Sequence, residues 1–109
     1  TDWQRIAALY DDLLEQMPSP VIELNRAVAL SMAFGPAAAL PLVDELGEEP
    51  ALQGYHLLPA VRGDLLAKLG RYDEARAELE RAAQLTQNAR EQSLLRERAA
   101  SLPLAPRAG

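Results

Sequence analysis

Few residues of this chain could do acid, base or nucleophilic chemistry. The chain has one histidine, His56, no cysteine, and no serine within a sequence pattern that marks a nucleophile. The acidic pairs Asp11-Asp12 and Glu48-Glu49 are adjacent in sequence, so their carboxylates do not share a face as a general acid and base would. His56 has no further ligand at a metal-site spacing. We therefore expect no catalysis, no bound metal and no cofactor.

Size and charge exclude further classes of function. The chain has 109 residues, the size of one domain, and 16 acidic against 11 basic residues give a net charge of −5. This is the wrong sign for sequence-independent binding to a phosphate backbone, which depends on Lys and Arg. No stretch approaches the roughly 18 consecutive apolar residues of a membrane span, so we expect no membrane contact and a cytoplasmic location. The first residue is Thr1 rather than Met, which suggests a piece of a longer protein.

Any site in this chain must be positioned by helices. The chain has 20 Ala and 20 Leu against 8 Val, Ile and Thr together, and Ala and Leu lose little on entering a helix. Apolar residues spaced by three and four, with Pro and Gly between the segments, predict an all-α protein. Thr1 with Gln4 matches a capping box, and Ser19 before Pro20 is a second helix-start signal. The predicted helices cover residues 2–17, 20–33, 36–46, 55–69, 71–86 and 89–101, with a loop at 48–54 that has room for a short helical turn.

A repeat organises these helices. Gly35 and Gly70 stand 35 residues apart, and each follows an apolar helix and precedes an amphipathic one. Residues 63–75, GDLLAKLGRYDEA, resemble the tetratricopeptide repeat, whose period is about 34 residues and whose small residues let paired helices approach closely. By this resemblance the fourth and fifth helices should meet at Gly63 and Ala75.

The expected architecture is built from two such units. The first, at about 21–50, matches the repeat less well, because Leu40 stands at the position that Ala75 has in the second. The two units with their flanking helices resemble a tetratricopeptide-like right-handed solenoid of about six antiparallel helices. We expect residues 1–102 to form a single domain and 103–109 to be a frayed tail.

The first helix of each unit lines the concave side of a tetratricopeptide solenoid. Residues that the register places there, besides those of the candidate groove below, are Ile22, Ala29, Ala60, Lys68 and Glu91. The candidate partner-binding groove consists of Asn25, Arg26, Met32, Tyr55, His56, Leu57, Arg62, Asp64, Leu94 and Arg98.

The polar candidates also have structural interpretations. Capping or hydrogen bonding within the bundle is an equal alternative for Asn25 and Asp64. Tyr55 and His56, at a helix start, are more typical of a cap or of packing on the previous unit than of a groove edge. Arg62 replaces a residue that is usually apolar in the repeat, so it must extend to solvent or pair with an acid. Its candidate partners are Asp64, Glu23 and Asp44.

Three segments together resemble a narrower family. They are PVIELNRAVA at 20–29, GYH at 54–56 followed by RGDLL at 62–66 and LGR at 69–71, and NARE at 88–91 followed by LLR at 94–96. In this order and spacing they resemble the C-terminal tetratricopeptide-like extension of bacterial extracytoplasmic-function (ECF) RNA polymerase sigma factors, over nearly the whole chain. Two residues depart from the family pattern: Gly63, where Ala is expected, and Pro41, inside a usually continuous helix.

The resemblance implies that the longer protein directs RNA polymerase to selected promoters. This chain would then be a non-catalytic regulatory domain that binds protein, namely its own sigma domains, RNA polymerase or a regulator. Promoter DNA would be contacted only by upstream domains outside this chain. Two alternatives stay open: a tetratricopeptide scaffold that binds a peptide of an unrelated partner, and a small hydrolase or ligand-binding bundle.

Overall fold

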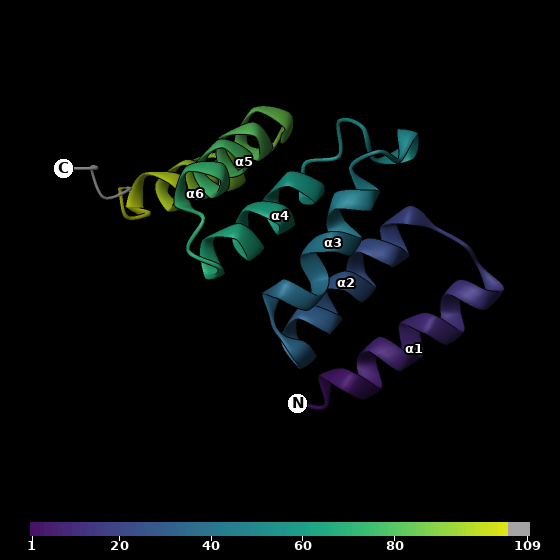
Figure 1. Cartoon of the computed structure of the whole chain (residues 1–109). Helices are drawn as coiled ribbons and strands as arrows, with labels where there is room; N and C mark the ends of the chain where they lie inside the picture. The colour runs from purple at the N-terminus through teal and green to yellow at the C-terminus, as the bar shows by residue number, and fades with distance from the viewer. Residues whose placement is uncertain (105–109) are drawn as a thin grey trace. The chain divides into compact units, whose positions relative to one another are not determined.

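The computed structural model describes residues 1–104, and these form six α-helices and one short 3₁₀ helix without a β-strand (Figure 1). The all-α prediction and the short turn within 48–54 are confirmed. Of the predicted tail, Pro103 and Leu104 are exposed and not helical, and 105–109 lie outside the described residues. The elements in chain order are α1 (Trp3–Gln16), α2 (Pro20–Phe34), α3 (Pro36–Leu46), η1 (Pro50–Leu52), α4 (Leu57–Lys68), α5 (Tyr72–Leu85) and α6 (Ala89–Ser101).

The first two helices begin at polar caps. Asp2 caps α1, because its Oδ1 accepts a hydrogen bond from the Arg5 N–H at 3.0 Å. The predicted capping box of Thr1 and Gln4 is therefore corrected. A carboxylate satisfies a free N–H group at the helix start and carries the charge that the positive end of the helix dipole favours. Ser19 caps α2, as predicted.

The fourth helix begins at Leu57, two residues later than predicted, so Tyr55 and His56 lie in the turn before it. Pro59 gives the physical reason. Proline has no N–H to donate, and only the first turn of a helix leaves N–H groups without an intrahelical acceptor. A start at Leu57 keeps Pro59 within that turn, whereas a start at Tyr55 would place it beyond. Gly54, before the turn, has a φ of +81°, which glycine adopts freely.

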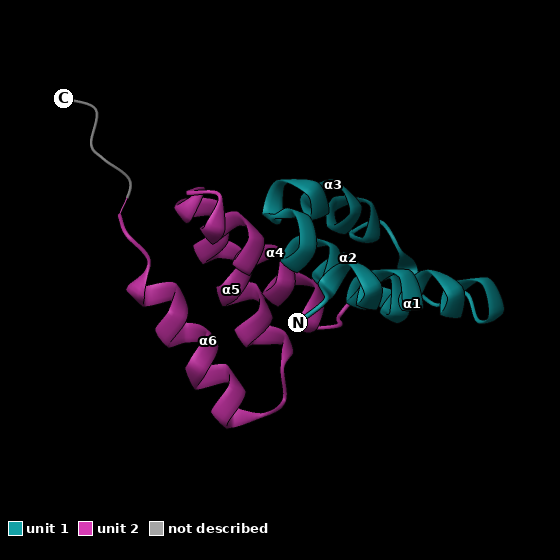
Figure 2. Ribbon diagram, turned by 90° about the horizontal axis from the view of Figure 1, so that it is seen from below, with its two compact units in different colours: residues 1–53 teal, residues 54–109 magenta. Residues whose placement is uncertain are grey.

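Contacts between helices divide the chain into two compact units, residues 1–53 and residues 54–109 (Figure 2). Within unit 1, α2 packs against α1 and α3, and η1, whose Leu52 is buried, also contacts α2. Within unit 2, α5 packs against α4 and α6. Each unit is thus a series of three helices in which each helix packs on the next one along the chain.

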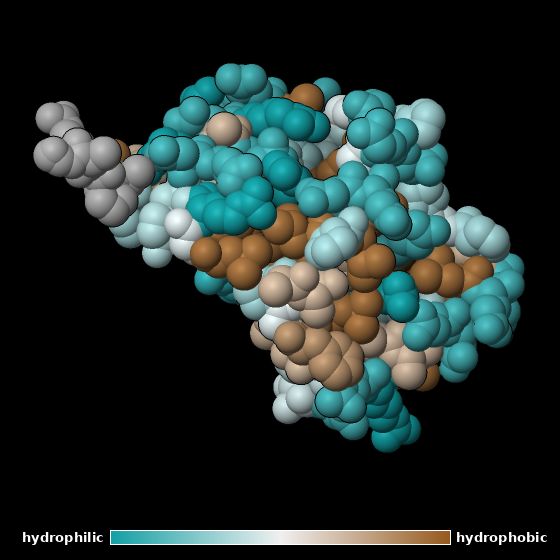
Figure 3. Space-filling view, viewed as in Figure 1, coloured by the Kyte–Doolittle hydropathy of each residue, from teal (hydrophilic) through white to brown (hydrophobic). Residues whose placement is uncertain are grey.

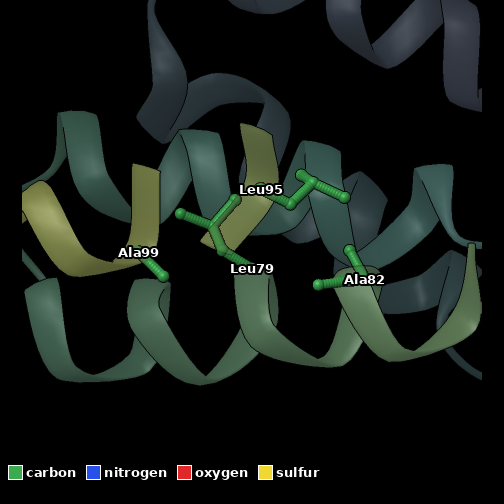
Figure 4. Close-up of a cluster of buried hydrophobic side chains, with 5 residues drawn as sticks. Leu79, Ala82, Leu95 and Ala99 are labelled. Carbon is green, nitrogen blue, oxygen red and sulfur yellow. The ribbon is translucent and has the colours of Figure 1, made fainter. Parts of the chain in front are cut away.

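The core of unit 2 forms where α5 meets its two neighbours. Leu79 and Ala82 of α5 lie against Leu95 and Ala99 of α6 (Figure 4). Together with Ala83 they form one cluster of buried apolar side chains. The small residues of this cluster bring the helix backbones close, and the two leucines fill the space that remains.

The fourth and fifth helices approach closely, as the repeat register predicts. A Cβ added at Gly63 would lie 3.0 Å from Cγ and Cδ2 of Leu79 and 3.2 Å from the carbonyl oxygen of Ala75. These distances are shorter than an ordinary van der Waals contact. The two helices can therefore lie this close only because residue 63 has a hydrogen atom in place of a side chain. Ala75 itself is fully buried.

Two arginines form hydrogen bonds near the start of α5. Arg76 donates from Nη2 to the carbonyl oxygens of Leu102 and Pro103 at 3.3 and 3.1 Å, which ties α5 to the residues that follow α6. Arg71 donates to both carboxylate oxygens of Glu74 at 2.6 and 2.8 Å. This hydrogen bonding, with the positive charge of Arg71, holds the pKa of the Glu74 carboxyl below its ordinary value.

Candidate protein-interaction site

Unit 2 brings polar residues of α4 and α6 together in two places. In the turn before α4, Nε2 of His56 lies 2.7 Å from Oε1 of Glu91. Two helical turns further along, Nη2 of Arg98 donates to Oδ1 of Asp64 at 2.7 Å, and Nζ of Lys68 lies 3.0 Å from Oδ2 of Asp64. All five residues were predicted on the concave side or at its edge. We define the α4–α6 face as the surface made by His56, Leu57, Ala60, Asp64, Glu91, Leu94 and Arg98.

Residues at the start of α6 and in the turn before α4 position the side chains of Glu91 and His56. Asn88 caps α6, and its Oδ1 accepts the N–H of Glu91 at 3.0 Å. Oγ1 of Thr86 lies 3.5 Å from Oε2 of Glu91 and accepts the N–H of Asn88 at 3.3 Å. The Tyr55 ring meets the His56 imidazole edge-on, with 5.9 Å between ring centres. Sequence reasoning missed Thr86; its signal is a Thr two residues before an Asn helix cap.

Two exposed leucines accompany the polar connections. Leu57 is 39% exposed and lies two helical turns before Asp64, on the same side of α4. Leu94 is 51% exposed and lies between Glu91 and Arg98 along α6. The α4–α6 face therefore offers apolar area beside charged groups, which suits a protein segment better than a small ion. Among the described residues, no three His, Asp or Glu side chains are grouped as metal ligands.

Arg62 belongs to a different contact. Its Nη1 lies 3.6 Å from Oε2 of Glu78 on α5, and the mostly buried Glu78 also receives Nη1 of Arg81 at 3.4 Å. Glu78 was not among the partners expected for Arg62 from the sequence. Asp64 was expected as a partner, but it forms its hydrogen bond with Arg98 in the α4–α6 face. The available signal for Glu78 was its place on α5 beside the buried stripe of that helix.

Unit 1 holds the other three candidate residues, all on α2. Arg26 forms an ion pair with Asp11 of α1, so its guanidinium faces the neighbouring helix. Asn25 and Met32 are exposed and stand seven residues apart, on one side of α2. Ala29 lies between them in sequence and is buried, so only Asn25 and Met32 of these three residues are exposed to solvent.

Comparison with known proteins finds a longer relative. The chain is similar to an uncharacterized protein of Rhizobium meliloti (strain 1021), with 49% identity over 96 residues. The match covers 88% of this chain and 22% of the relative, so the chain spans about a fifth of that protein's length. No family model and no solved structure matches. Across residues 1–104, no helix combines the length and the apolar character needed to cross a bilayer.

Proposed function

We propose that this chain is a tetratricopeptide-like domain of an ECF-type bacterial sigma factor. It acts without catalysis, by holding a protein segment on the α4–α6 face. The segment comes from the sigma domains of the same protein, from RNA polymerase or from a regulator. Through this contact the domain adjusts how the sigma factor works with the polymerase.

The observation that carries the proposal is the sequence separation of the connected residues. Asp64 and Arg98 are 34 residues apart and hydrogen-bonded, and His56 and Glu91 are 35 residues apart and in contact. In a solenoid with a 34-residue repeat, equivalent positions of successive repeats lie side by side. Two contacts at this separation, one between α4 and α6 and one between the turn before α4 and the start of α6, support a tetratricopeptide-like stacking of α4, α5 and α6.

Charge and length support a role as one part of a larger protein. The net charge of −5 suits contacts with protein rather than with the DNA backbone. The relative extends far beyond the matched region, since 22% of its length is covered. Promoter recognition then belongs to other domains of the polypeptide. The three segments at 20–29, 54–71 and 88–96 supply the resemblance to ECF sigma extensions.

Removing the domain tests this proposal. We expect deletion of residues 1–102 from the longer protein to change promoter-directed transcription by about fivefold or more, because a regulatory contact would be lost. The measurement is run-off transcription in vitro with purified RNA polymerase. An unchanged yield would refute the regulatory role. A longer protein that never directs polymerase to a promoter would refute the sigma assignment and favour the scaffold alternative.

A second prediction concerns the α4–α6 face itself. Changing Leu57 and Leu94 together to Gln should move transcription toward the level of the deletion, because exposed apolar anchors carry much of a protein contact. Stability should change by less than about 1 kcal/mol per site, since 39% of Leu57 and 51% of Leu94 is already exposed to solvent. The control is Leu69→Gln, a leucine at the end of α4 that is about as exposed as Leu57, which should leave transcription unaltered. Equal effects of the two variants would remove the face from the mechanism.

A further inference from the structure

Helix α1 has more apolar surface than its neighbour covers. Ala7 is buried and Leu14 is half-buried, and α2 is the helix that packs on α1 within unit 1. Leu9 and Leu13 stand one turn apart on another side of α1 and are 59% and 38% exposed, and Met17, at the end of the helix, is 62% exposed. We call Leu9, Leu13 and Met17 the outer face of α1.

Helix α6, the last helix of unit 2, differs in this respect. Helix α6 also packs on one neighbour, α5, but Leu94 is its only exposed large apolar residue, and most of its other exposed residues are polar. They include Arg90, Arg96 and Glu97. A terminal helix of a solenoid needs such a polar outer side to face water. Helix α1 has a polar side too, with Arg5, Asp12 and Glu15 exposed, but Leu9, Leu13 and Met17 bring three large apolar side chains to the surface beside it. Hydrophobic residues lie among hydrophilic ones on the surface of the molecule (Figure 3).

We infer that the outer face of α1 is covered by an amphipathic helix directly before Thr1 in the longer polypeptide. The inference rests on the proposed function in taking the chain as one part of a longer protein. In both units, consecutive helices are joined by one to three residues and pack on each other. A preceding helix joined in the same way would run antiparallel to α1 and place its apolar stripe on Leu9 and Leu13.

A second copy of this chain does not fit the same face. The outer face offers on the order of 300 Å² of apolar surface, so two copies would bury roughly 600 Å² in total, about half of what the smallest specific interfaces bury. A segment of the same polypeptide needs no such area, because its effective concentration is high. The longer relative shows that a polypeptide containing this region can have ample further sequence.

Thiol labelling tests the inference, because the chain has no cysteine of its own. Leu9→Cys is prepared in the 109-residue chain and in the longer protein, and labelling by a maleimide is followed by mass spectrometry of the α1 peptide. We expect labelling at position 9 to be at least about tenfold slower in the longer protein. The control is Ala8→Cys, an exposed neighbour on the polar side of α1, which should label at similar rates in both.

Two outcomes would overturn the inference. Equal labelling of Leu9→Cys in both proteins would mean that the outer face stays open. Slow labelling in the 109-residue chain that speeds up on dilution would mean that a second copy covers it. If position 9 is protected in the longer protein but that protein directs no transcription, the sigma assignment is refuted and the inference that the outer face of α1 is covered is supported. The two proposals can therefore fail separately.

Discussion

Replacing Leu79 with Ala is expected to lower the free energy of unfolding by about 2–5 kcal/mol. Leu79 is 1% exposed and fills the space between α4, α5 and α6, against Leu95 on one side and Gly63 on the other. Removing three carbon atoms leaves a cavity that the surrounding alanines are too short to fill. A unit of this size has a small core, so such a loss is a large share of its stability. Urea denaturation followed by circular dichroism measures the change.

The control for this prediction is a leucine of the same unit that is not in the core. Leu94→Ala removes the same atoms from a side chain that is 51% exposed, and its cost should stay within about 0.5 kcal/mol. Similar unfolding midpoints for the Leu79 and Leu94 variants would contradict the packing of α5 described above.

Replacing Ala75 with Leu should cost about 1–3 kcal/mol by overpacking the contact between α4 and α5. Ala75 has no exposed surface, and its carbonyl oxygen lies 3.2 Å from the place where a Cβ on Gly63 would be. The added side chain must therefore push the two helices apart or adopt a strained rotamer. The melting temperature of the variant, followed by circular dichroism at the helix signal, measures this cost.

Helix α5 offers a matched control. Ala77→Leu makes the same change two residues later, at an exposed position, and Ala and Leu differ little in helix propensity. We expect the Ala77 variant to melt close to the unsubstituted chain. If Ala75→Leu and Ala77→Leu melt at the same temperature, the assignment of Gly63 and Ala75 to a close helix contact is wrong.

Much of the helical structure could be predicted because local signals mark the helix ends. Ser19, Gly35 and Gly70 each stand at a boundary where the residue type satisfies or breaks the backbone hydrogen-bonding pattern. The predicted start of α4 at Tyr55 takes Pro59 as part of the first turn, but Pro59 would be the fifth residue of such a helix; with the observed start at Leu57 it is the third. At α1 the predicted cap is Thr1, whereas the structure has Asp2; both residue types are common helix caps, so the residue type alone does not fix which of two neighbours caps the helix.

Helix register predicts which candidate residues share a side, but not every partner of a long side chain. The predicted repeat register places Asp64 and Arg98 on the same side of the helices, and the structure brings the two side chains within hydrogen-bonding distance. The contact of Arg62 with Glu78 was not predictable in the same way, since an arginine side chain is long enough to reach several acids around its helix. Spacing gives the side of a helix from which a side chain leaves, but not where a long side chain ends.

Within each unit, the packing of each helix on the next one also affects how the structure forms. Loops of one to three residues link the three helices of a unit, so most core contacts join residues that are near in sequence. Chain topologies of this kind have low contact order, and they fold in microseconds to milliseconds because little loop-closure entropy opposes each step. Helix pairs can therefore assemble one after another as the ribosome releases them, before the whole chain has been synthesised.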